Sequence, residues 1–148
     1  MVKILFLCHG NICRSPMAEF IMKALAREAG LASRLRIDSA AVSREEIGNP
    51  IYPPAQRQLR AHGVPFDDHR ARQMTRADYG AYDLLIGMDR QNLAGMRRIC
   101  SGDPDGKLRL LMDYTGAARD VADPWYTGDF DAVWRDIESG CRALLDSL

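Results

Sequence analysis

The chain has 148 residues, 47% of them hydrophobic, and its 20 basic side chains balance its 20 acidic ones. This composition excludes long disordered regions, and the balanced charge gives no reason to expect nucleic acid or an acidic membrane as a partner. No apolar run approaches the roughly 20 residues of a membrane-spanning helix, and the apolar stretch Ile4–Leu7 lacks the features of a signal peptide. We expect a single domain over residues 1–148.

The predicted elements begin with a strand and a helix. An apolar run predicts a fully buried strand over residues 2–7, and helical spacing of apolar residues from Ser15 predicts a helix that stops at Gly30. Alternation around Leu35 and Ile37 predicts a second strand near the edge of the sheet, with a loop over residues 39–43 after it.

Further strands and helices alternate along the rest of the chain. Pro53-Pro54 opens a predicted helix that ends near Gly63, and Thr75 with Asp78 predicts a capped short helix. Residues 82–88 and 107–112 are predicted strands, with a helix over residues 89–100 between them and a final helix from residue 130. Such alternation is typical of an α/β fold with a parallel sheet, whose ligands bind beyond the carboxyl ends of the strands.

The four cysteines indicate neither a disulfide scaffold nor a metal site. None of them belongs to a Cys-x-x-Cys pair, the spacing that zinc sites commonly use. Reduced thiols are typical of the cytoplasm, where we expect the protein to act as a monomer without a cofactor.

The stretch from Cys8 to Ser15 lies between the first predicted strand and the first predicted helix. Helix N-termini carry unpaired N–H groups and partial positive charge, so the backbone here can surround a phosphate. Cys8 can attack phosphorus, and the planar guanidinium of Arg14 can hold two phosphate oxygens at once. The predicted phosphate-binding residues form one run: His9, Gly10, Asn11, Ile12, Cys13, Arg14 and Ser15.

Individual residues of this run suit a loop around an anion. Gly10 offers conformational freedom and close approach of the backbone, and Asn11 tolerates a positive φ. Ser15 can either cap the helix or hydrogen-bond the Cys8 sulfur. Cys8 by itself would read as an ordinary buried thiol, but the surrounding pattern favours a phosphate site.

Asp123 is the predicted proton donor to the leaving group. Pro124 restricts it to extended geometry, and Trp125 and Tyr126 can form an apolar wall beside it. An ordinary Asp-Pro turn is the alternative, and Asp120 is a second candidate for the donor.

Cys-x5-Arg-Ser-Pro near the N-terminus resembles the low-molecular-weight protein tyrosine phosphatases. The resemblance continues through Asp38-Ser39-Ala40-Ala41, Glu46-Ile47-Gly48-Asn49-Pro50, His69-Arg70-Ala71-Arg72-Gln73 and Asp123-Pro124-Trp125-Tyr126. It implies a three-layer α/β/α domain with a four-stranded parallel sheet in the order 2-1-3-4. It also implies metal-free hydrolysis of phosphotyrosine in proteins, and of small aryl phosphates, through a cysteinyl phosphate. The implied partners are a phosphotyrosyl protein, such as a tyrosine kinase, and the product inorganic phosphate.

The same resemblance implies roles for residues outside the catalytic trio of Cys8, Arg14 and Asp123. A supporting network is expected from Asn11, Ser15, Ser39 and His69, although His69 alone would read as a surface histidine. Cys13 is a candidate redox partner that traps Cys8 as a disulfide.

The wall of the cleft departs from the family pattern. Family members often have an aromatic residue before Glu46, whereas Arg44-Glu45 stands here, so a charged wall at Glu45 is expected opposite Trp125 and Tyr126. Basic residues beside the phosphotyrosine should then be preferred.

Three other functions stay open. Bacterial members of the family also act on phosphoarginine, and the size of residue 12 bears on that choice. Arsenate reductases share the scaffold but need a further cysteine to relay oxidising equivalents, and no cysteine lies between Cys13 and Cys100. A phosphotyrosine-binding module without activity is disfavoured because nucleophile and acid are both present. A nucleotide-binding loop is excluded, since Gly-x4-Gly-Lys-Ser/Thr is absent.

Overall fold

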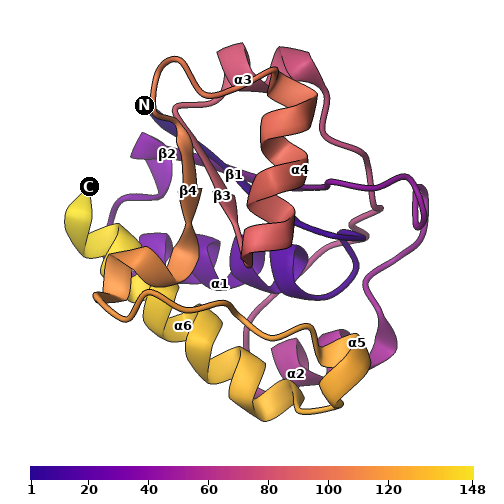
Figure 1. Ribbon diagram of the computed structural model, residues 1–148. Helices are drawn as coiled ribbons and strands as arrows, with labels where there is room; N and C mark the ends of the chain where they lie inside the picture. Colours follow the sequence, from indigo (N-terminus) through magenta and orange to yellow (C-terminus); the bar gives the residue numbers. More distant parts are fainter.

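A four-stranded parallel sheet lies at the centre of the computed structural model, which describes residues 1–148 (Figure 1). The strands are β1 (Val2–Cys8), β2 (Leu35–Ala41), β3 (Leu84–Gly87) and β4 (Leu108–Leu110), in the spatial order β2-β1-β3-β4. Helices α3 (Arg76–Ala81) and α4 (Arg90–Cys100) lie on one face, and α1 (Arg14–Glu28), α2 (Pro53–Ala61) and α6 (Phe130–Ser147) lie on the other. The predicted α/β class and the implied strand order are confirmed.

Strand β1 is apolar from Ile4 to Cys8 because both of its faces are buried there. Ile4, Phe6 and Cys8 join the larger core beneath α1 and α6, whereas Leu5 and Leu7 join the smaller core beneath α4. Complete burial of each large side chain contributes about 1.5–3 kcal/mol, so this strand anchors both layers. The same alternation places Cys8 at the carboxyl end of β1, on the α1 side of the sheet.

Helix α1 begins directly after the loop that follows β1. Its N-cap is Cys13, and no side chain caps it, so Ser15 lies inside the first turn and does not serve as the cap. The predicted stop is confirmed, because Gly30 follows the helix with φ +72° and its N–H donates to the Arg27 carbonyl.

Predicted boundaries of β2, β3 and β4 are wrong by two residues or more, and β3 begins at Leu84 and not at residue 82. Strand β2 continues through residues 39–41, which the sequence suggests as a loop, because Ser39, Ala40 and Ala41 pair with Phe6, Leu7 and Cys8 of β1. Small side chains fit this buried position although their intrinsic strand preference is low. Strand β4 ends at Leu110, and a 3₁₀-helix over Leu111–Thr115 replaces the predicted last residues of the strand.

The segment before the last helix contains an element that the sequence analysis does not predict. Helix α5 (Pro124–Thr127) is capped by Asp123, whose carboxylate accepts a hydrogen bond from the Trp125 N–H at 3.0 Å. Pro124 at the first helical position and Gly128 just past the end delimit it. The predicted capping box of Thr75 and Asp78 at the start of α3 is confirmed.

One core joins the two ends of the chain. Residues of β1 and of α6 belong to the same buried cluster, and α1 packs against α6. This arrangement supports the proposal of a single domain over residues 1–148. No helix combines the length and the apolar content needed to cross a membrane.

Candidate active site

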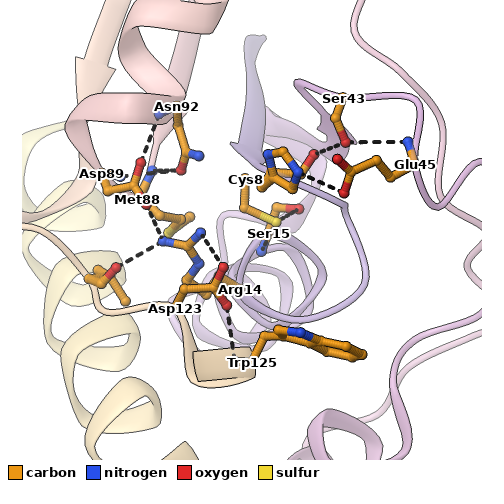
Figure 2. A network of polar contacts seen from close by, with 12 residues as sticks. Cys8, Arg14, Ser15, Ser43, Glu45, Met88, Asp89, Asn92, Asp123 and Trp125 are labelled. Carbon is orange, nitrogen blue, oxygen red and sulfur yellow. Dashed lines mark hydrogen bonds and ion pairs between the residues drawn. The ribbon is translucent and has the colours of Figure 1, made fainter. Parts of the chain in front are cut away.

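The loop between β1 and α1 lines one part of a cavity of about 160 Å³. Cys8 lies at its base with 3% of its surface exposed. The Cys8 sulfur is 3.0 Å from the Ser15 hydroxyl, and the Ser15 N–H donates to the sulfur at 3.4 Å (Figure 2). The lining residues are Cys8, His9, Gly10, Ile12, Cys13, Arg14, Glu45, Glu46, Asp123, Trp125 and Tyr126.

Asn11 holds the loop in a strained backbone conformation. Its φ is +61°, a region that costs a non-glycine residue about 1–3 kcal/mol and persists only where the surroundings enforce it. The Asn11 amide nitrogen donates to the hydroxyls of Ser15 at 2.7 Å and Ser39 at 3.0 Å. Its amide oxygen accepts from His69 Nε2 at 3.0 Å and from the Arg72 N–H at 3.3 Å. The structure therefore brings together all four residues of the expected supporting network.

Glu19 completes this network and is missed by the sequence analysis. The Ser39 hydroxyl donates to Glu19 Oε1 at 2.7 Å, and His69 Nδ1 lies 3.7 Å from the same oxygen. Burial lowers the pKa of His69, and the Glu19 carboxylate opposes that shift. The available signal is a carboxylate at a buried position of the first helix, between Met17 and Phe20.

Gly10 lets the segment around Glu46 approach the loop closely. Its φ is not in the left-handed region, so Asn11 is the residue of the Gly10–Asn11 pair with a positive φ. A Cβ at this position would lie 3.1 Å from Glu46 Cγ, which is tighter than an ordinary contact. Glycine therefore allows the loop and the segment around Glu46 to pack against each other.

Arg14 is buried and is held from three directions. NH1 donates to Asp89 Oδ2 at 2.7 Å and to the Val121 carbonyl at 2.9 Å, and NH2 lies 3.5 Å from Asp123 Oδ2 (Figure 2). Burial alone would lower the pKa of Arg14. The Cys8 sulfur and the carboxylates of Asp89 and Asp123 outweigh that effect and raise it. The guanidinium thus stays charged and has a fixed orientation.

Asp89 is a second residue that the sequence analysis misses. One carboxylate oxygen accepts from the Asn92 N–H at 2.7 Å and caps α4, while the other holds Arg14. A signal was available, because Asp89 follows β3 closely, as the phosphate loop follows β1, and ligands bind at the carboxyl ends of parallel strands.

Of the two candidate donors, Asp123 lines the cavity and Asp120 does not. The Asp123 side chain is 27% exposed, and its Oδ2 faces Arg14. Asp120 instead accepts from the Arg90 N–H at the start of α4, at 3.2 Å. Trp125 and Tyr126, 57% and 85% exposed, form one rim of the cavity, with Trp125 packed against Tyr52 at 5.1 Å between ring centroids.

Residues 3–148 match the family model described as low molecular weight phosphotyrosine protein phosphatase. The chain belongs to this family. Its members are hydrolases, and the proposed resemblance is confirmed.

Relatives of this phosphatase cover almost the whole chain. Low molecular weight protein-tyrosine-phosphatase YfkJ of Bacillus subtilis is 40% identical over 150 residues, which cover 100% of this chain and 96% of that protein. The human low molecular weight phosphotyrosine protein phosphatase is 36% identical over 148 residues, which cover 97% of this chain and 93% of that protein.

Solved structures of similar proteins have the same fold. The crystal structure of YfkJ superposes with a TM-score of 0.96, over 99% of this chain and 94% of that one, at 40% identity. A Drosophila arginine phosphatase superposes with a TM-score of 0.90, over 99% and 97% of the two chains, at 29% identity.

The wall opposite Trp125 is charged in this low molecular weight phosphatase. His9 and Glu45 line it, and Glu45 Oε2 accepts from His9 Nε2 at 2.9 Å. Glu46 also lines the cavity, and its carboxylate accepts from the Asn49 side-chain amide at 2.6 Å.

Cys13 shares the cavity with Cys8 although it is buried. Burial raises the pKa of the Cys13 thiol well above its usual value, and the Cys8 sulfur adds to the shift. The phosphatase therefore carries a protonated thiol in the same cavity as the Cys8 sulfur.

Proposed function

We propose that this protein hydrolyses phosphotyrosine in proteins, and small aryl phosphates, through a cysteinyl-phosphate intermediate. The observation that supports this most is the convergence of Cys8, Arg14 and Asp123 on one cavity, with NH2 of Arg14 3.5 Å from Asp123 Oδ2. A nucleophile, a cation and an acid then reach the same substrate, as in-line phosphoryl transfer requires.

The first step transfers the phosphoryl group to sulfur. NH1 of Arg14 already binds Asp89 and Val121, so NH2 and Nε are left to hold two phosphate oxygens beside the loop N–H groups. The Cys8 thiolate attacks phosphorus, the S–P bond forms and the bond to the phenolic oxygen breaks. Asp123 delivers its proton to that oxygen, and phenol leaves.

The second step returns the enzyme to its starting state. Asp123, now a carboxylate, takes a proton from a water molecule as the water attacks phosphorus. The S–P bond breaks and inorganic phosphate is released. The Ser15 hydroxyl, 3.0 Å from the sulfur, stabilises the departing thiolate by hydrogen bonding.

The rim of the cavity supports an aryl substrate. Trp125 and Tyr126 can flank a phenyl ring, and Cys8 lies at the cavity base with only 3% exposure, where a phosphate on a short serine side chain would not reach. A tyrosine kinase as partner, the monomeric state and the cytoplasmic location stay predictions from the sequence.

A phosphoarginine substrate is the second candidate, and likeness to the Drosophila arginine phosphatase favours it. An arsenate reductase is less well supported, because Cys100 and Cys141 are buried on α4 and α6 and neither lines the cavity.

A substrate panel tests the proposed function. Peptides of one sequence that carry phosphotyrosine, phosphoserine or phosphoarginine are compared by kcat/KM, with arsenate-dependent consumption of reductant measured in parallel. We expect phosphotyrosine to be the best substrate by about tenfold or more, since the rim contacts an aryl ring. A higher kcat/KM for phosphoarginine would replace the proposal with the second candidate.

We further propose that Cys13 protects Cys8 from irreversible oxidation. Hydrogen peroxide would oxidise the Cys8 thiolate to a sulfenic acid and be reduced to water; the Cys13 thiol would then form the disulfide and release a second water. Added thiol reductant would restore both residues. After peroxide treatment, the wild type should recover its activity with thiol, and Cys13→Ser should recover much less. Equal recovery would count against this role.

A further inference from the structure

A ring of hydrogen bonds fixes Glu45 at the mouth of the cavity. The Ser43 hydroxyl donates to the His9 carbonyl at 2.9 Å and accepts from the Glu45 N–H at 3.4 Å. The ring closes where Glu45 Oε2 accepts from His9 Nε2 at 2.9 Å. Figure 2 shows Ser43 and Glu45 on one side of Cys8 and Trp125 on another. The carboxylate is therefore held against the residue that follows the nucleophile.

The second oxygen of this carboxylate is available to a substrate. Of the two carboxylate oxygens of Glu45, the ring uses Oε2, and Oε1 has no hydrogen-bond partner in the structure. The Glu45 side chain is 68% exposed, so a ligand can reach it from solvent. A fixed, accessible acceptor beside a catalytic cavity suits a cationic donor.

The charges of the mouth also favour a cation. The wall carries the carboxylates of Glu45 and Glu46. Arg14, the one guanidinium among the lining residues, lies at the base and is already bound to Asp89. A phosphate is thus drawn to the base of the cavity, while the groups around it meet negative charge.

We propose that the His9–Ser43–Glu45 ring makes Glu45 a specificity-determining residue that selects phosphotyrosine flanked by lysine or arginine. This inference rests on the proposed function and names the substrate class for the same site. Exposed ion pairs are weak, so the expected preference is about two- to fivefold for each basic neighbour. Salt at about 1 M, where the Debye length is about 3 Å, should largely remove it.

Two phosphotyrosyl peptides that differ only in Lys or Gln beside the phosphotyrosine provide the test, with kcat/KM measured for each at low salt. We expect the wild type to prefer the Lys peptide, Glu45→Gln to lose the preference, and Glu45→Lys to prefer a Glu-flanked peptide. Ser43→Ala keeps the carboxylate but breaks the ring, and should reduce the preference. Glu28→Gln is the matched control. It removes one exposed carboxylate at the far end of α1, and about 1.5 Å per residue over 15 residues places it about 20 Å from the loop.

The outcomes separate the inference from the function on which it rests. Equal kcat/KM for the Lys and Gln peptides in the wild type, or an unchanged preference in Glu45→Gln, would overturn the inference alone. If Ser43→Ala kept the full preference for the Lys peptide, the proposed role of the ring in positioning Glu45 would be overturned. If the wild type hydrolysed neither of the two peptides nor phenyl phosphate, the proposed function would be overturned together with the inference.

Discussion

Cys8→Ser should abolish hydrolysis of aryl phosphates, a loss on the order of 10⁵–10⁶-fold, as for removal of other enzymatic nucleophiles. A serine hydroxyl at the end of β1 would face the same Arg14 and the same loop N–H groups, but it is a far weaker nucleophile than a thiolate. The change removes the sulfur and leaves the phosphate-binding groups in place, so binding and turnover should separate.

The measurement combines steady-state turnover of phenyl phosphate with phosphate binding followed through tryptophan fluorescence, to which Trp125 on the rim contributes. Binding should survive in Cys8→Ser while turnover is lost. Cys100→Ser is the matched control, because it makes the same replacement at a buried thiol of α4 outside the cavity. Turnover in Cys8→Ser above about 1% of wild type would contradict the role of nucleophile.

Asp123→Ala should lower kcat by about 10²–10⁴-fold, with the largest loss for poor leaving groups. A poor leaving group depends most on the proton that Asp123 delivers, whereas an activated phenol departs without it. The measurement is a series of substituted phenyl phosphates, with log kcat plotted against the pKa of the leaving phenol. The slope should steepen in the variant.

Two further variants isolate the chemistry from the fold. Asp123→Asn keeps an oxygen that can accept the Trp125 N–H and cap α5, yet it cannot deliver the proton, so it should behave like Asp123→Ala. Asp120→Ala should keep the wild-type slope, since its carboxylate binds the Arg90 N–H and does not line the cavity. An unchanged slope in Asp123→Ala would show that Asp123 is not the general acid. A steeper slope in Asp120→Ala would assign that role to Asp120.

The strongest part of the site was predictable because it is local in sequence. Cys8 and Arg14 belong to one short loop between a strand and a helix, and the unpaired N–H groups of that helix start are a property of any helix. Asn11 at positive φ followed from the conformational freedom of asparagine. By contrast, the close packing of Glu46 against Gly10 depends on a segment distant in sequence and was not predictable from the loop itself.

Residues that act across the sheet were not predictable in this way. Asp89 reaches Arg14 over 75 positions of sequence, and the Val121 carbonyl over 107. Glu19 joins the loop through His69 and through Ser39, which lies on a strand that the sequence analysis ends too early. The His9–Glu45 contact likewise depends on how the segment after β2 folds back over the loop.

The sequence by itself determined the alternation of strands and helices, the family, and the candidate phosphate loop that contains Cys8 and Arg14. These follow from hydrophobic periodicity and from chemistry contained in a few adjacent residues. Tertiary structure alone decided which carboxylates meet Arg14, which aspartate lines the cavity and which charges surround its mouth. The reason is geometric: a parallel sheet gathers the carboxyl ends of distant strands at one edge, and no local pattern records that meeting.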